Sequence, residues 1–141
     1  MAETLEIKII CAEGELASLN ATEIYIPAHK GKAGILPHHI PYITLLSFGE
    51  VSICDISGKW HYNFVDEGFV EVKDNVVTII SESVVPADKL ERSEVDSQLK
   101  HVEEKIQSSF KGDISAEELK DALLDKEKWQ IKADILDKTT K

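Results

Sequence analysis

Residues 69–81 read FVEVKDNVVTIIS and carry the clearest secondary-structure signal in the chain. Three of the four side chains in residues 69–72 are apolar, and apolar β-branched residues fill most of Val76–Ser81. The polar tripeptide Lys73-Asp74-Asn75 lies between them. Strand-like segments on both sides of a short polar turn are typical of a β-hairpin. The stretch therefore predicts two antiparallel strands.

Shorter stretches on the N-terminal side of this hairpin show related patterns. In residues 59–65, for example, Trp60, Tyr62 and Phe64 share one face of a predicted strand that follows the turn Ser57-Gly58. Many short strands separated by turns indicate an antiparallel sandwich or barrel, and no helix-length amphipathic stretch interrupts them. We therefore expect an antiparallel β-sandwich domain over residues 1–87. Its other predicted strands are residues 5–11, 21–27, 40–46 and 51–56.

After Pro86 the pattern becomes helical. Asp88 with Glu91 three residues later has the spacing of a capping box and predicts a helix start at this point. The glycine of Lys111-Gly112-Asp113 predicts the helix end, because glycine readily adopts the left-handed conformation found there. Between them, apolar residues spaced mostly three and four apart form a stripe along one helix face. They are Leu90, Val95, Leu99, Val102, Ile106 and Phe110.

A second helix is predicted from the capping residues Ser115 and Glu118 and from apolar residues that continue to Leu136. Two amphipathic helices with a short loop between them form an antiparallel hairpin. We expect residues 88–141 to be a helical hairpin domain, which makes the whole chain α+β and mainly β. One apolar stripe per helix gives a thin core. The hairpin should therefore pack on the β-sandwich or on a partner, and the sequence leaves both arrangements open.

The composition narrows the classes of partner. A net charge of −10 disfavours nucleic acid and anionic lipid, because both require clustered Lys and Arg. The N-terminus MAETLEIKII lacks the features of a secretory signal, and no segment approaches the roughly 18 apolar residues of a membrane span. Cys11 and Cys54 lie outside any C-x-x-C spacing, and we expect two buried free thiols in strands.

The histidines are the first candidates for chemistry. A small metal-dependent hydrolase using His29, His38, His39 and His61 is one alternative function. Adjacent histidines of an extended segment point to opposite faces, so His38 and His39 would hardly bind one ion. We expect a rigid corner between Pro37 and Pro41, with one of these histidines packed or hydrogen-bonded and the other exposed.

Other catalytic patterns are missing from the sequence. It contains no G-x-S-x-G elbow, no P-loop and no G-x-G-x-x-G motif. Glu103-Glu104 and Glu117-Glu118 fit solvated helix faces. We therefore expect no catalytic residues, no cofactor and no metal. A further alternative is a free-standing adaptor whose hairpin captures an unrelated helix.

Two longer motifs are more specific. Residues 31–41, GKAGILPHHIP, precede Leu45-Leu46 and Gly49-Glu50-Val51. Residues 68–72, GFVEV, precede residues 75–79, NVVTI. Together with residues 10–13, ICAE, they resemble the epsilon subunit of F-type ATP synthase, which is called delta in mitochondria. The resemblance spans essentially the whole chain, although Glu67 stands where the family has a glycine.

The resemblance implies a non-catalytic rotor subunit of the central stalk, in which a β-sandwich and a helical hairpin serve proton-driven ATP synthesis. The β domain would bind the gamma subunit and the polar loops of the proteolipid c-ring, so that ring and shaft turn together. The hairpin would lie against the sandwich, or extend along gamma toward the catalytic beta subunits and restrain ATP hydrolysis. The subunit would be peripheral, attached through the complex to the cytoplasmic face of the bacterial cell membrane.

The resemblance also assigns partner contacts to particular residues. The loop of His29, Lys30, Gly31 and Lys32 matches the ring-facing loop of the family, which often has an acidic residue in place of Lys32. The corner near gamma matches His39 and Pro41.

Two further assignments of the family fall in the hairpin. Many bacterial members bind ATP through the pattern I/L-D-x-x-R-A, which corresponds here to Leu90, Glu91, Glu94 and Val95. Glu94 replaces the arginine that would face phosphate, so we expect no ATP binding. The candidate inhibitory contacts to beta are Lys120, Lys126, Lys128 and Lys132. Acidic residues lie between them, so we expect weak inhibition.

Overall fold

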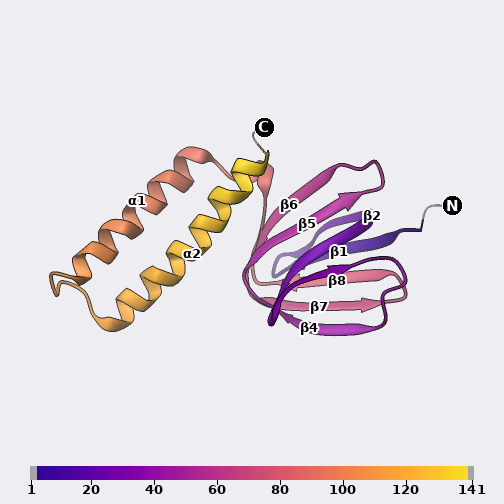
Figure 1. The fold of residues 1–141 in the computed structure, drawn as a ribbon, viewed down its shortest axis with the longest axis horizontal. Helices are drawn as coiled ribbons and strands as arrows, with labels where there is room; N and C mark the ends of the chain where they lie inside the picture. The colour runs from indigo at the N-terminus through magenta and orange to yellow at the C-terminus, as the bar shows by residue number, and fades with distance from the viewer. Residues whose placement is uncertain (1–2, 140–141) are drawn as a thin grey trace. The chain divides into compact units, whose positions relative to one another are not determined.

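The computed structural model describes residues 3–139, in which nine β-strands precede a short 3₁₀-helix and two α-helices (Figure 1). The described residues form two compact units: the first ends at Pro86 and the second begins at Ala87. The first unit holds all the strands and the second holds the helices. The α+β, mainly β, fold class with an N-terminal β-sandwich and a C-terminal helical hairpin is thus confirmed.

The strands of the first unit follow the path β1-β8-β7-β4-β2-β5-β6-β9, with β3 paired to β2 and a further pairing of β1 with β2 (Figure 1). Their bounds are β1 (Leu5–Cys11), β2 (Gly14–Ala28), β3 (Gly31–Ile35), β4 (Tyr42–Leu46), β5 (Gly49–Asp55), β6 (Trp60–Val65), β7 (Gly68–Lys73), β8 (Val76–Ser81) and β9 (Val84–Pro86). The sequence predicts seven of these strands, β1 and β8 with the same ends and the others with shifted ends, and it misses the short strands β3 and β9.

Strand β2 is the longest of the described strands and belongs to both layers of the sandwich. Its first half pairs with β1, and its second half pairs with β3 and β5. The pairing with β5 shifts register between Ala21 and Glu23, as at a β-bulge, and such irregularities bend a strand. The predicted strand over residues 21–27 is therefore only the second half of a longer element.

The β7–β8 hairpin is present as the sequence predicts. Phe69 pairs with Ile80 and Val72 pairs with Val77 in antiparallel register. Asp74 and Asn75 have positive φ angles of 51° and 63°. Two consecutive residues with positive φ give a turn whose twist matches the right-handed twist of the strands, and Asp and Asn tolerate this conformation well.

Strand β1 pairs with β8 in parallel, with Glu6 opposite Val76 and Cys11 opposite Ser81. The sequence predicts only antiparallel pairs, so the parallel pairing of β1 with β8 differs from the prediction. It arises because the pairing joins segments about 70 residues apart, and no local pattern encodes their relative direction.

The core of the sandwich is aliphatic. Burial of each large aliphatic side chain contributes about 1.5–3 kcal/mol. The largest fully buried side chains of this unit are Leu5, Ile7, Ile9, Ile24, Ile26, Ile35, Ile53, Ile79, Val51, Val65 and Val70. The alternation of residues 5–11 and 21–27 therefore identifies core positions correctly.

Two expectations about side chains differ from the structure. Trp60 is exposed and Tyr62 is half-buried, whereas Phe64 of the same predicted face is buried. Alternation gives the face of a strand, but it does not show how far a neighbouring layer covers that face. Cys54 is a buried free thiol as expected, but Cys11 is only half-buried because it ends β1 at the rim of the sandwich.

In the second unit the first helix begins later than predicted. A 3₁₀-helix (Ala87–Lys89) contains Asp88, and α1 (Arg92–Ser109) has Glu91 as its N-cap without a side-chain hydrogen bond. The predicted start at Asp88 is therefore wrong. The extended backbone of Glu91, with φ −111° and ψ 128°, separates the two helical segments.

The second helix and the loop before it follow the prediction. The backbone N–H of Glu118 donates to Ser115 Oγ over 3.1 Å, and α2 (Ala116–Thr139) follows this cap. Gly112 has φ +76° in the loop after α1, and the N–H of Asp113 donates to the carbonyl of Ser108.

The hairpin buries a small core. Val95, Ala133 and Leu136 form a buried cluster, and three half-buried residues pack against it: Leu90, Leu99 and Trp129. Arg92 forms an ion pair with Asp137, and Lys126 forms one with Glu103. The thin core expected from one apolar stripe per helix is present.

Candidate partner-binding surfaces

The corner between Pro37 and Pro41 is held by a distant turn. His38 has a positive φ of 68°, and its backbone N–H donates to Asn75 Oδ1 over 2.6 Å. Its ring Nε2 lies 2.9 Å from a carboxylate oxygen of Glu3. The backbone N–H of His39 donates to the carbonyl of Leu36. These bonds fix the corner against the β7–β8 turn, which explains a backbone conformation that non-glycine residues rarely adopt.

The two adjacent histidines have different surroundings. His39 is half-buried, its Nδ1 lies 2.8 Å from the carbonyl oxygen of Ile40, and its ring lies 5.6 Å from the ring of Tyr42. His38 is exposed. The expected division into one hydrogen-bonded and one exposed histidine is confirmed. Pro41 is exposed beside them.

His61 lies apart from this corner, on β6. Its Nε2 lies 2.7 Å from Asp55 Oδ2, while Asp55 Oδ1 accepts hydrogen bonds from Ser57 and from the backbone N–H of Lys59. The hydrogen bonds from Ser57 and His61 hold the pKa of Asp55 well below its ordinary value. Asp55 therefore fastens the β5–β6 turn.

No three His, Cys, Asp or Glu side chains among residues 3–139 lie close enough together to hold a metal ion. The structure does not bring His29, His38, His39 and His61 into one site. The metal-dependent hydrolase therefore has no ligand set in the described part of the chain.

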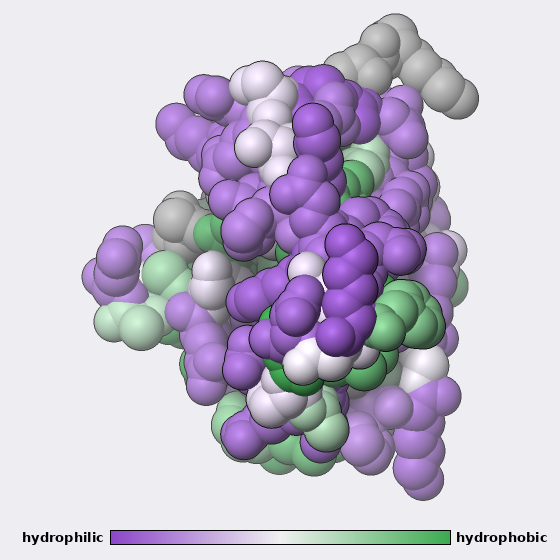
Figure 2. Space-filling model, turned by 90° about the vertical axis from the view of Figure 1, so that its left-hand side faces the viewer, coloured by the Kyte–Doolittle hydropathy of each residue, from purple (hydrophilic) through white to green (hydrophobic). Residues whose placement is uncertain are grey.

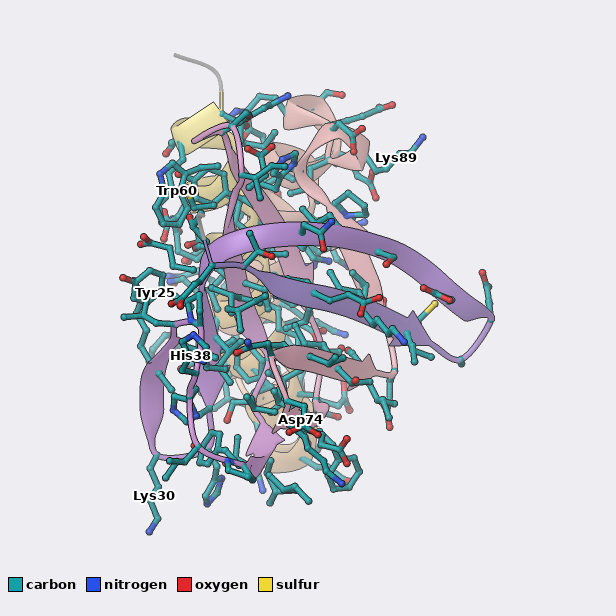
Figure 3. All side chains as sticks on the ribbon, turned by 90° about the vertical axis from the view of Figure 1, so that its right-hand side faces the viewer. Tyr25, Lys30, His38, Trp60, Asp74 and Lys89 are labelled. Carbon is teal, nitrogen blue, oxygen red and sulfur yellow. The ribbon has the colours of Figure 1, made fainter. Side chains whose placement is uncertain are left out.

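The turn between β2 and β3 and the first two residues of β3 form an exposed loop. His29, Lys30, Gly31 and Lys32 are all exposed, and the backbone N–H of His29 donates to the carbonyl of Leu45 over 3.0 Å. Figure 3 shows Lys30 pointing away from the sheet into solvent. The loop is thus anchored at its base and presents two ammonium groups.

Lys32 lies beside a row of aromatic side chains that the sequence does not reveal. Its Nζ lies 5.1 Å from the ring centroid of Tyr25, whose ring lies 6.1 Å from that of Trp60. The ring of Trp60 in turn lies 6.5 Å from that of Tyr62. A cation over an aromatic ring is stabilised by the negative face of the ring. The row exists because the register places Tyr25 opposite Ser52, and Ser52 opposite Tyr62.

A second surface lies on the strands β4, β7 and β8. Leu45, Phe69 and Ile80 are 51%, 55% and 48% exposed, and Ile43 and Ile40 nearby in sequence are 71% and 74% exposed. Figure 2 shows a different side of the molecule, the one on the left in Figure 1, where hydrophilic side chains predominate over apolar ones. Contiguous exposed apolar side chains mark interaction sites. The sequence does carry a signal of this surface. Apolar residues occupy both odd and even positions in residues 40–46, so both faces of this strand carry apolar side chains.

The hairpin contains the degenerate nucleotide pattern. Leu90 is half-buried and Val95 is buried in the hairpin core, while Glu91 and Glu94 are exposed. The nearby guanidinium of Arg92 lies beside Asp137 and Asp96. Carboxylates surround the one guanidinium of this segment, so the surroundings of Glu94 do not favour phosphate.

The four candidate inhibitory lysines lie along α2 and differ in their contacts. Lys126 pairs with Glu103, and Lys132 Nζ lies 3.9 Å from the ring centroid of Trp129. Lys120 is exposed and Lys128 is half-buried. Contacts inside the hairpin therefore engage Lys126 and Lys132.

Within residues 3–139, no helix has the length and apolar character needed to cross a membrane. The fold and the surfaces define a β-sandwich protein with a helical hairpin and an exposed apolar surface that suits binding to other proteins.

Comparisons with known proteins identify the family to which this β-sandwich protein belongs. Residues 4–87 match the family of the ATP synthase delta/epsilon chain, beta-sandwich domain. An ATP synthase epsilon chain of Thioalkalivibrio sulfidiphilus is 36% identical over 107 residues, which cover 75% of this chain and 76% of that one. One of Nitrosococcus oceani is 32% identical over 107 residues, 76% of each chain. The chain therefore belongs to the family of epsilon subunits of F-type ATP synthase, as the resemblance predicts.

A solved structure supports the fold. A chain in the cryo-EM structure of the Euglena gracilis mitochondrial ATP synthase (OSCP/F1/c-ring) superimposes with a TM-score of 0.81 at 19% identity. The match covers 94% of this chain and 81% of that one. At this identity the likeness concerns the fold, and it extends over both the sandwich and the hairpin.

Proposed function

We propose that the chain couples rotation in the central stalk of an F-type ATP synthase without catalysing a reaction itself. Its β domain binds the gamma subunit and the polar loops of the c-ring, so that ring and shaft turn together during proton-driven ATP synthesis. The chain is peripheral and reaches the cytoplasmic face of the membrane through the complex alone. The exposed apolar surface on β4, β7 and β8 carries this proposal, since such a surface in a family of complex subunits calls for a protein partner.

Two segments of the β domain contact different partners. His39 and Pro41 contact gamma from the corner that His38 and Asn75 hold in place. His29, Lys30, Gly31 and Lys32 contact the c-ring from the anchored loop after β2. Both segments are fixed by hydrogen bonds, which limits the conformational entropy lost on binding.

The hairpin regulates hydrolysis weakly. When it extends along gamma, Lys120, Lys126, Lys128 and Lys132 meet an acidic segment of the catalytic beta subunits. Acidic residues lie between these lysines, and Lys126 first gives up its ion pair with Glu103 of α1, so the inhibition is weak.

A pull-down with gamma from the same source tests the coupling role. Scrambling residues 31–41 would destroy β3, so a single exposed residue is the better target. Ile43→Asp places a charge in the apolar surface, and Ile56→Asp places one on an equally exposed isoleucine in the β5–β6 turn. We expect the wild-type chain and Ile56→Asp to retain gamma and Ile43→Asp to lose most of it. A wild-type chain that retains no gamma contradicts the proposal.

A further inference from the structure

The outer face of β1, β8, β7 and β4 carries an apolar row that crosses all four strands. Leu45 is paired with Phe69, Phe69 with Ile80, and Ile80 with Ile10. Directly paired residues point to the same face of a sheet. Leu45, Phe69 and Ile80 are 51%, 55% and 48% exposed, and Ile10 is less exposed than these three.

Leu45, Phe69 and Ile80 of this row line a hollow at the ends of the strands. The hollow has a volume of about 760 Å³, and Leu45, Phe48, Phe69 and Ile80 supply apolar surface to it. Apolar hollows of this kind bind large apolar side chains, because the aromatic or aliphatic group leaves water on entering.

Two carboxylates line the same hollow. Gly68 and Ser81 are the last pair of the β7–β8 hairpin, and Glu67 and Glu82 are the residues just beyond it on the two strands. The backbone N–H of Glu82 donates to the carbonyl of Glu67 over 3.2 Å. Like charges on directly opposite residues destabilise a sheet. Neither carboxylate has a Lys, Arg or His nitrogen within 4.0 Å among residues 3–139.

We infer that the hollow binds a segment of the rotor partner in which a large apolar side chain lies next to an arginine or lysine. The apolar side chain fills the space beside Phe69 and Ile80, and the basic group lies between Glu67 and Glu82. This inference rests on the proposed function and names the chemistry of the contact.

Charge complementarity selects this occupant over others. A second copy of the chain related by a two-fold axis would bring Glu67 and Glu82 against the same carboxylates, in a protein of net charge −10. Anionic lipid headgroups meet the same repulsion. A basic partner segment instead brings a cation to two carboxylates that form no ion pair among residues 3–139.

Calorimetric titration of the purified full-length chain with gamma tests the inference. The double variant Glu67→Gln with Glu82→Gln keeps the shape of both side chains and removes their charge. We expect its affinity to fall about tenfold and its salt dependence to become shallower, as for loss of a charged contact. Its melting temperature without gamma should stay equal, because neither carboxylate forms an ion pair in the described part of the chain. A structural role would lower affinity and melting temperature together.

Glu71→Gln is the matched control, because Glu71 is exposed on the same face and lies outside the hollow. It should bind as the wild type does. If the double variant also binds like the wild type, the inference is wrong while the proposed function stands. If the wild type itself does not bind gamma, the proposed function fails. A wild-type dimer in sedimentation that Phe69→Ser dissolves would assign the hollow to a second copy and overturn the inference.

Discussion

Replacement of Gly68 by alanine should unfold the β domain at a much lower temperature. A Cβ atom at this position would lie 1.9 Å from the carbonyl oxygen of Ile80 and 2.9 Å from Ser81 Cα. Neighbouring strands ordinarily keep carbon and oxygen about 3.3 Å apart or more, so the backbones must separate by roughly 1.4 Å. Overpacking of this kind costs about 1–3 kcal/mol. One or two weakened ladder hydrogen bonds add about 1 kcal/mol each, for a total of about 2–5 kcal/mol.

Thermal unfolding followed by far-UV circular dichroism measures this cost. For a domain of this size the loss corresponds to a melting temperature lower by roughly 8–40 °C. Gly58→Ala is the control, because a Cβ there has open space and only the φ of +90° opposes it. That strain costs about 1–2 kcal/mol. If Gly68→Ala loses no more stability than Gly58→Ala, the close approach to Ile80 is not the reason for the glycine.

Three further predictions concern the turn at Asp55 and the hairpin. The pKa of Asp55 is lowered by hydrogen bonds from Ser57 and His61, so its stabilisation is complete above the unfolded value of about 3.9. It is lost progressively as the pH falls from there toward the depressed folded value. Asp55→Asn should therefore lower the melting temperature at pH 7 and flatten its decline in acid, and an unchanged acid slope would contradict this. Titration of the purified chain with millimolar ATP should give no saturable heat, because Glu94 stands where the family has arginine; saturable binding would refute it. Deletion of residues 88–141 should leave the ATPase rate of the assembled complex unchanged, and a several-fold rise would reveal strong inhibition.

Local chemistry predicts several elements of this fold. The β7–β8 hairpin follows from a polar turn of Asp74 and Asn75, both of which adopt positive φ. The start of α2 follows from Ser115, whose hydroxyl accepts the N–H of Glu118. Each signal lies within a few residues of the feature that it predicts, so the sequence alone is sufficient.

The elements that sequence reasoning missed depend on distant segments. The late start of α1 is a local exception. Asp88 is a suitable capping residue, but the extended residue Glu91 separates the 3₁₀-helix from α1. Exposure of Trp60 depends on how far other elements cover its face of the sheet. The hollow at Glu67 and Glu82 depends on the β7–β8 pairing and on β4 and β1 beside it, which no short window of sequence contains.

The parallel pairing of β1 with β8 has a consequence for synthesis of the chain. About 70 residues separate paired positions, so β1 leaves the ribosome long before its neighbour exists. At 5–20 residues per second the wait is roughly 4–14 s. During it, one edge of β1 offers free N–H and C=O groups to any passing strand. The nascent chain is therefore most exposed to aggregation at its beginning, and a chaperone that shields residues 5–11 would act at the point of greatest need.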